Sequence, residues 1–341
     1  MTQSINDANK QHVLNYWQAL QEAGPGGSGP VAMDYLAAEH RWHGFDPVNE
    51  LDGRLYFVTG FWEPLLTSFP DLERHTWIFF GGKSNGRIDG TGDEGMWVTG
   101  TGILHGTFAR DYLGIPATGA PVDMRWGEFC RLENGRIAET FFLIDMIDLM
   151  QQAGFDVLPP SRGKDRMYPP PDARDGVLLT AADPDESAYS LEHIRRFIFE
   201  GLNAYDESNL ESMGMADYFH PNVRWYGPGG IGACLSFKEF ETNHQAPWLH
   251  AFPDRSVQNL DALLAEGAYS GAPGWNGVIA TQQGEYLGHP ASGKRFGVNG
   301  LDWWKRDGEQ YIENWVFVDM LHLFRQLGVD LMAKLEALKK G

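Results

Sequence analysis

The chain lacks the features of several common classes of protein. Its 341 residues include only two cysteines, Cys130 and Cys234, too few for a disulfide framework or a zinc cluster. No apolar run approaches the roughly 20 residues of a membrane span, and the polar N-terminal stretch has no signal-peptide core. Positive charge is scarce, with 27 Lys and Arg against 46 Asp and Glu. Because the resulting field repels phosphate groups, we expect no nucleic-acid or membrane partner. The lack of a signal peptide and of a membrane span leads us to expect a cytoplasmic protein.

The chain contains an internal sequence repeat with two copies. Four blocks recur in the same order. The two copies of the first and of the second block lie 183 residues apart (217 − 34), and the two copies of the third and of the fourth block lie 174 residues apart (319 − 145). Such ordered matches indicate a duplicated unit. The block pairs are "DYLAAEHRWHG" (34–44) with "DYFHPNVRWYG" (217–227), "SFPD" (68–71) with "AFPD" (251–254), "YLGIPATG" (112–119) with "YLGHPASG" (286–293), and the Asp-Met pairs at 145 and 319.

A proline-rich segment separates the two copies. Residues 158–188 include "LPPSRGKDRMYPPPDARDG", and clustered prolines resist both helix and sheet. We therefore predict a first domain over residues 1–157, a linker over 158–188 and a second domain over 189–341. Each domain has enough residues to bury a core of its own.

Hydrophobic periodicity within one copy predicts helices first and strands afterwards. In the first copy, helical spacing covers residues 11–24, 32–40 and 55–69, and strand-like segments cover 73–82, 95–108, 121–135 and 136–145. An Asn-Gly pair at 134–135 predicts a hairpin turn. The predicted class is α+β, with a curved antiparallel sheet wrapped on N-terminal helices to form a cone with one open mouth.

These blocks resemble the SnoaL-like polyketide cyclase family of the NTF2-like superfamily. The motifs that carry the resemblance are "GIPATG", "ENGRI" and "DMIDLMQQAG", and the similarity spans residues 8–157 and 189–335. It implies two tandem NTF2-like cone domains. Single-copy relatives pair through the outer faces of their sheets, so we expect the two cones to form an intramolecular pseudo-dimer. A homo-oligomer of such chains stays compatible with this arrangement.

The resemblance also implies a function. Family cyclases use an aspartate, three residues before the Asp-Met pair, as general acid/base; that position is Phe142 in one copy and Val316 in the other. We expect a small, largely apolar carbonyl compound as ligand, with cofactor-free cyclisation, isomerisation, dehydration or hydrolysis. Non-catalytic binding or scaffolding is the alternative, because both copies lack the aspartate. The sequence offers no cofactor loop, and since "HRWH" (40–43) is not repeated as histidines we expect no metal site.

Acidic residues inside apolar strands are the strongest catalytic candidates. Glu128 lies in "MRWGEFCRL", and Asp302 in "NGLDWWKR" falls opposite it within one residue. Trp126, Glu128 and Cys130 share one strand face, and burial there would raise the pKa of an acid toward neutrality. The alternative is an outward-facing acid paired with a neighbouring arginine.

Two histidines are candidate partners of these acids. His105, in "GILHGTF", would form an acid–base dyad with Glu128 if the two lay side by side, or would be structural. His244 corresponds to Phe61 in the first copy, which indicates that the two cones have diverged.

Six further residues are candidate ligand contacts. Asp145 and Asp319 would either begin the last helix of each copy as N-caps or present carboxylates at the cone mouth. His43 and its counterpart Tyr226 can bond a ligand oxygen, and Trp126 and Trp304 can line an aromatic pocket or fill a core.

Overall fold

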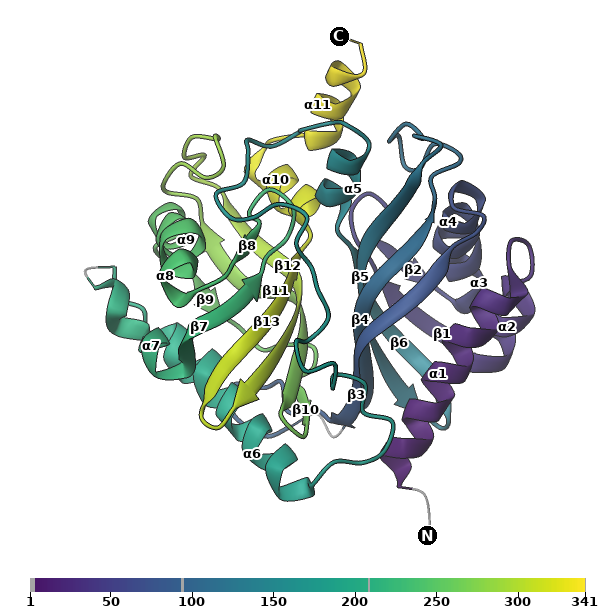
Figure 1. Ribbon diagram of the computed structural model, residues 1–341, viewed down its shortest axis with the longest axis horizontal. Coiled ribbons are helices and arrows are strands. Elements are labelled where there is room, and N and C mark those ends of the chain that lie inside the picture. Colours follow the sequence, from purple (N-terminus) through teal and green to yellow (C-terminus); the bar gives the residue numbers. More distant parts are fainter. Residues whose placement is uncertain (1–3, 93–94, 208, 341) are drawn as a thin grey trace.

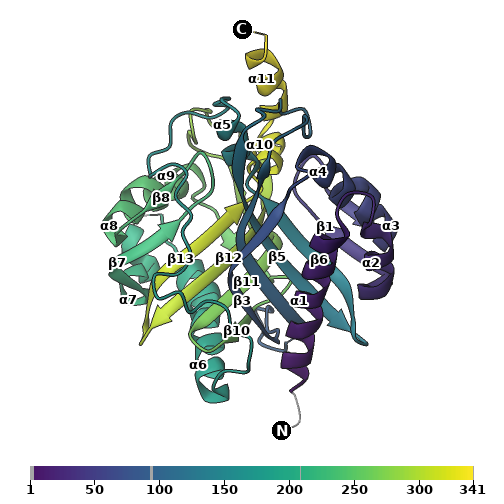
Figure 2. The same ribbon diagram turned by 45° about the vertical axis from the view of Figure 1, so that its right-hand side comes forward.

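The computed structural model describes residues 4–92, 95–207 and 209–340 and shows two halves of the same α+β architecture. Each half has one open sheet, and most of its helices cover the sheet face that is turned away from the other half, whereas the helices that follow the last strand of each half meet between the two halves (Figures 1 and 2). The two sheets therefore meet in the middle of the molecule. We call the half that ends with α5 domain 1 and the half that begins with α6 domain 2.

The two sheets have equivalent strand orders. Domain 1 has the order β2-β1-β6-β5-β4-β3, and domain 2 has β8-β7-β13-β12-β11-β10, with β9 also paired to β11. The strands are β1 (Leu36–His43), β2 (Glu50–Asp52), β3 (Glu73–Lys83), β4 (Met96–Thr107), β5 (Pro121–Glu133), β6 (Arg136–Ile144), β7 (Phe219–Tyr226), β8 (Ala233–Cys234), β9 (Ser256–Val257), β10 (Leu264–Glu266), β11 (Tyr269–Thr281), β12 (Arg295–Asp307) and β13 (Gln310–Val318).

The sheets are mixed, which corrects the expectation of a purely antiparallel meander. The consecutive long strands are antiparallel as predicted, but β1 pairs with β6 in parallel, and β7 pairs with β13 in the same way. Parallel pairing needs a long crossover, and the helices and strands between β1 and β6 provide one. The segment 36–40, expected to be helical, is the start of β1.

Helices open each domain and close it. The periodic helix expected over 11–24 is α1, whose N-cap Ser4 accepts a hydrogen bond from Asp7 N at 3.1 Å. Of the helices within the described ranges, none is both long and apolar enough to cross a bilayer. They are α1 (Ile5–Ala23), α2 (Ser28–Tyr35), α3 (Arg54–Phe57), α4 (Glu63–Ser68), α5 (Met146–Gln152), α6 (Pro184–Arg195), α7 (Met215–Tyr218), α8 (Phe237–Phe240), α9 (Ala246–Ala251), α10 (Met320–Leu327) and α11 (Leu331–Leu338).

A π-helical turn interrupts the second helical block of each domain. Val58–Trp62 joins α3 to α4, and Glu241–Gln245 joins α8 to α9. Pro64 and Pro247 follow these turns, and a proline has no N–H to continue the α-helical ladder. Such wide turns often occur at functional sites because they re-aim side chains.

The segment between α5 and α6 contacts both domains. Tyr168 stacks on Trp77 of β3 and meets Phe317 of β13 edge-on. Gly163 N donates to the Ile231 carbonyl oxygen before β8 at 3.0 Å, and Lys164 N donates to the Ala233 carbonyl oxygen of β8 at 2.8 Å. The helix α6 begins at Pro184, inside the stretch assigned to the linker.

The two sheets pack against each other around one indole. Trp303 of β12 stacks on Phe129 of β5 with 5.0 Å between ring centroids, and its N–H donates to Thr99 Oγ1 at 3.0 Å. A Cβ atom at Gly127 would lie 2.4 Å from this indole, so glycine is required for the close approach. This packing is the pseudo-dimer arrangement that the duplication predicts.

A buried ion pair adds to this interface. Lys10 Nζ on α1 lies 2.7 Å from Glu266 Oε1 on β10, and both side chains are buried. Glu266 Oε2 also accepts from Gly81 N of β3 at 2.9 Å. Asn6 Nδ2 also donates to Glu266 Oε1 at 3.2 Å, so this one carboxylate of domain 2 accepts from three donors of domain 1.

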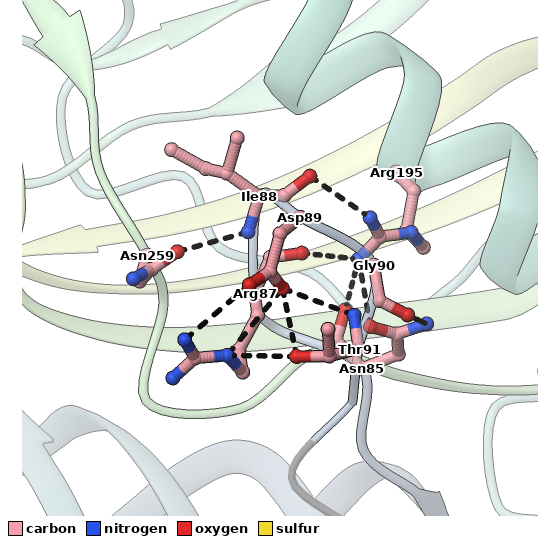
Figure 3. A network of polar contacts seen from close by, with 8 residues as sticks. All are labelled: Asn85, Arg87, Ile88, Asp89, Gly90, Thr91, Arg195 and Asn259. Atoms are coloured by element: carbon pink, nitrogen blue, oxygen red, sulfur yellow. Dashed lines mark hydrogen bonds and ion pairs between the residues drawn. The ribbon is translucent and has the colours of Figure 1, made fainter.

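The loop between β3 and β4 clasps domain 2 (Figure 3). Arg195 Nη1 on α6 donates to the carbonyl oxygens of Asn85 and Arg87, at 2.7 and 2.8 Å. On the other side of the loop, Ile88 N donates to Asn259 Oδ1 at 2.9 Å. These bonds join the domains through backbone groups as well as side chains.

We predict that Glu266→Gln destabilises the protein by roughly 3 kcal/mol, because the buried Lys10 ammonium then keeps only its longer contact of 3.5 Å with Asp7 Oδ1. Urea unfolding measures the change. Glu336→Gln, which breaks the exposed pair with Lys339, is the matched control and should change little. The double variant Lys10→Met, Glu266→Gln should recover part of the loss. A midpoint for Glu266→Gln equal to that of the wild type would contradict the prediction.

Candidate functional site

Domain 2 encloses a mainly apolar cavity between its sheet and the segment α8–α9. This main cavity has a volume of about 200 Å³. A side cavity of about 100 Å³ adjoins it, and Asp302, Trp304 and Val257 line both spaces. Asp302 therefore stands where the two spaces meet. The Phe, Trp and Tyr members of the main wall are Phe197, Phe219, Trp225, Phe240, Trp248, Tyr286 and Trp304.

Asp302 is a carboxylate for which the described residues provide no ion-pair partner. It lies in the middle of β12, where alternation sends Trp303 to the domain interface and Asp302 into the cavity. Burial raises the pKa of Asp302 to about 7, although a hydrogen bond from Asn314 acts in the opposite direction. Near neutral pH such a group both accepts and releases a proton.

His244 lies on the helical wall of the same cavity. It belongs to the π-helical turn Glu241–Gln245 and stacks on Trp225, with 4.2 Å between ring centroids. Burial, together with the charge of Arg255, lowers the pKa of His244 to about 3, so the ring is neutral at physiological pH. Its Nδ1 and the nearby Tyr286 hydroxyl have no hydrogen-bond partner among the described atoms. Both are free to meet a ligand oxygen.

In domain 1 the equivalent carboxylate is neutralised. Glu128 Oε2 lies 2.7 Å from Arg74 Nη1, and both side chains are buried. The Arg74 guanidinium in turn lies over Trp126 and Trp17, with its carbon 4.2 and 4.6 Å from the ring centroids. Trp126 is thus part of this packed cluster. Because β5 and β12 share the same 174-residue offset at both ends, Glu128 and Asp302 correspond without any shift.

Large side chains fill the remaining equivalent positions of domain 1. Phe61 replaces His244, and Phe142 replaces Val316. The rings of Phe61 and Phe142 lie 5.0 Å apart, and Phe61 stacks on Trp42 at 4.5 Å. The interior that holds a cavity in domain 2 is therefore closely packed here.

His105 does not form the expected dyad with Glu128. In the antiparallel pairing of β4 with β5, His105 lies opposite Asp123, whereas Glu128 lies opposite Gly100. His105 is exposed, and its Nδ1 lies 2.7 Å from Asp123 Oδ1. The strand register, which the sequence did not reveal, separates the two residues by five positions along β5 (128 − 123).

Asp145 and Asp319 are helix caps that also join the domains. Asp145 Oδ1 accepts from Asp148 N at 3.0 Å, and Asp319 Oδ1 accepts from His322 N at 3.0 Å. The second oxygen of each reaches the other domain: Asp145 Oδ2 accepts from Gly229 N, and Asp319 Oδ2 from Asp46 N, both at 2.8 Å. The cap interpretation is confirmed, and both carboxylates lie at the domain interface rather than at a cone mouth.

The contacts of His43 and Tyr226 lie outside the main cavity. His43 Nε2 lies 2.9 Å from Glu139 Oε1. Burial alone would lower the pKa of His43, but hydrogen bonds with Glu139 and Glu50 outweigh it and raise the pKa to about 9. Tyr226 is buried against Trp315, with 5.5 Å between ring centroids. Its neighbour Trp225 lines the cavity instead, because successive strand residues face opposite sides.

Comparisons with known proteins agree with this architecture. The family model described as SnoaL-like polyketide cyclase matches residues 32–153 and again 193–327. The chain belongs to the SnoaL-like polyketide cyclase family. A search of curated proteins gave no match.

Solved structures of small proteins resemble one copy at a time. A proposed SnoaL-like polyketide cyclase from Jannaschia sp. CCS1 is 20% identical, with a TM-score of 0.35, covering 47% of this chain and 99% of its own. AclR, a proposed hydroxylase from Streptomyces galilaeus, is 19% identical, with a TM-score of 0.34 and coverages of 42% and 86%. IdmH, a proposed polyketide cyclase from Streptomyces antibioticus, is 19% identical, with a TM-score of 0.33 and coverages of 41% and 97%. The family assignment rests on the family model.

In this SnoaL-like chain the cavity acid sits one strand away from the position that the resemblance pointed to. Val316 of β13 lies directly opposite Asp302 of β12, and both line the main cavity. Side chains opposed in this way have Cβ atoms about 5 Å apart. A carboxylate on β12 therefore reaches nearly the same volume as one on β13 would.

Sequence reasoning missed four polar residues of the cavity wall: Gln245, Arg255, Tyr286 and Asn314. A position-by-position comparison of the two copies would have drawn attention to Arg255, whose counterpart is Leu72, because it places a charge where domain 1 has an apolar side chain. In the described part of the chain, no three His, Cys, Asp or Glu side chains are grouped to hold a metal ion.

We predict that Asp302→Asn changes how stability depends on pH. Burial raises the pKa of Asp302 in the folded state to about 7. The protonated side chain therefore contributes to the free energy of unfolding in full below the pKa of the unfolded state, and this contribution is lost as the pH rises through the folded-state pKa. Between pH 5 and 8 the wild type should therefore lose on the order of 2–3 kcal/mol relative to Asp302→Asn. Urea unfolding at the two pH values measures this. Equal pH dependence in the two proteins would refute it.

Proposed function

We propose that domain 2 binds a small, largely apolar carbonyl compound and that Asp302 moves protons at the carbon next to the carbonyl, without a cofactor. Removal of such a proton begins aldol cyclisation, isomerisation and dehydration alike. Domain 1 then serves as the packing partner that holds the sheet of domain 2. The proposal follows from the site of this chain and not from the activity of any relative.

One contrast carries the proposal: the Arg74 ion pair neutralises Glu128, whereas Asp302 faces a cavity without an ion-pair partner in the described structure. A buried carboxylate costs stability unless something compensates for it. A protein that keeps one beside a cavity, with a pKa raised to about 7 by burial, has a group suited to proton transfer.

The other polar groups of the wall fit the same chemistry. Removing a proton next to a carbonyl places negative charge on the carbonyl oxygen, and hydrogen-bond donors stabilise that charge. Neutral His244, on the helical side of the cavity, and the Tyr286 hydroxyl, on the loop between β11 and β12, can each donate to that oxygen. The mainly apolar lining lowers the local polarity, which strengthens these interactions.

Binding without chemistry is the second candidate. It is favoured by Phe142 and Val316, which occupy the position where the family's cyclases carry their aspartate. The two candidates differ in one observable property, because only an active Asp302 exchanges protons with the ligand.

Deuterium exchange tests the proposal without knowledge of the natural substrate. The wild type should accelerate exchange at the α-carbon of 2-tetralone in D₂O, followed by NMR. The rate should rise with pH through about 7, because the base must be ionised, and then level off. Asp302→Asn should lower the protein-catalysed rate by roughly 100- to 10,000-fold.

Glu128→Gln is the matched control, since it makes the same kind of change at the equivalent position of domain 1. It should leave the exchange rate within about twofold of the wild type while lowering stability, because Arg74 loses its partner. Equal rates for wild type and Asp302→Asn would sink the catalytic proposal. Saturable binding of 2-tetralone with no exchange would favour the binding-only alternative.

A further inference from the structure

A second charged residue of the main cavity has no charged partner in the described structure. Arg255 follows the "AFPD" block and lines the wall next to the segment that contains Leu202 and Met213. Its Nη2 donates to the Leu202 carbonyl oxygen at 2.7 Å and contacts the Met213 sulfur. No carboxylate of the described residues lies within ion-pair distance of the guanidinium.

This arginine remains a cation despite its surroundings. Burial lowers the pKa of Arg255 to about 10, which still leaves it protonated at neutral pH. Its guanidinium carbon lies 5.5 Å from the ring centroid of Tyr205, a weak compensation for lost hydration. Burying an unpaired charge is costly, so a group with this geometry is suited to an anion that arrives with the ligand.

Domain 1 also has an arginine and an internal acid, but there the two form an ion pair. There the arginine is Arg74, which corresponds to Val257, two positions beyond Arg255, and it pairs with the internal acid Glu128. In domain 2 the arginine and the acid remain separate. Only burial and Asn314 shift the pKa of Asp302, so Arg255 does not neutralise it. The charge of Arg255 acts instead on His244.

We infer that the ligand of the main cavity is a small apolar carboxylate, whose carboxylate group binds Arg255 while its apolar body lies against the aromatic wall. This deepens the proposed function and rests on it for the placement of the reacting carbon at Asp302. A planar carboxylate can accept two hydrogen bonds from a guanidinium, which a neutral isostere cannot match.

A pair of probes tests the inference by binding alone. Wild-type protein should bind 1-naphthoate at least about tenfold more tightly than the isosteric neutral 1-naphthamide at pH 8, measured by calorimetry. Arg255→Leu, which installs the side chain found at the equivalent position of domain 1, should abolish this preference and leave naphthamide affinity within about twofold. Arg255→Lys should retain part of it, because the charge remains but the planar fork is lost.

Arg295→Leu controls for the loss of one positive charge, since Arg295 is exposed at the start of β12. It should bind both probes as the wild type does. Equal affinities of the two probes for the wild type, a preference that persists in Arg255→Leu, or binding of neither probe would each overturn the inference. If Arg255→Leu does not fold, the wild-type comparison and Arg255→Lys still decide.

The two proposals fail in distinguishable ways. Asp302→Asn should keep the preference for naphthoate while losing deuterium exchange, and the exposed control Arg295→Leu should keep both properties. A wild-type protein that shows no deuterium exchange but still prefers naphthoate would contradict only the catalytic proposal. Intact exchange without any probe preference would contradict only the carboxylate inference.

Discussion

The packing of Trp303 between the two sheets fixes the direction of the neighbouring side chains on β12. Because strand residues alternate, an indole held against Phe129 and Thr99 of domain 1 forces Asp302 and Trp304 to the opposite face. A shift of one residue in this strand would exchange the two faces and bury Asp302 in the domain interface. The orientation of the candidate acid thus depends on the contact between the domains, and a single copy would lack that constraint.

The two copies solve the same electrostatic problem in different ways. Each has an acid at the same position of the same strand, and each also carries an arginine shortly after the Phe-Pro-Asp motif, Arg74 inside β3 and Arg255 just before β9. In domain 1 the pair is closed, with Arg74 held between tryptophan rings beside Glu128. In domain 2 the acid and Arg255 are held apart, and smaller or polar side chains leave a cavity between the helices and the sheet. An acid and an arginine that form an ion pair can be buried in a packed core, whereas an acid and an arginine that are held apart can each contact a bound ligand.

The aspartates before α5 and α10 show how a local signal can acquire a long-range role. One carboxylate oxygen of each caps its own helix, which any sequence with this pattern would need. The other oxygen accepts from a backbone N–H of the opposite domain, and that of Asp145 also lies 3.3 Å from Arg125 Nη1 of its own domain. Duplication therefore produced two equivalent cross-links from one capping residue.

The sequence by itself determined the local features of this protein. Repeated blocks specified two α+β units, periodicity placed α1 and the long strands, Asp145 and Asp319 marked helix starts, and alternation put Trp126 and Glu128 on one face. Tertiary structure decided the rest. It turned residues 36–40 into a parallel strand, separated His105 from Glu128, and paired Glu128 with Arg74, 54 positions away in the chain. Register and partner choice depend on contacts between distant segments, and short-range sequence patterns do not encode which segments will meet.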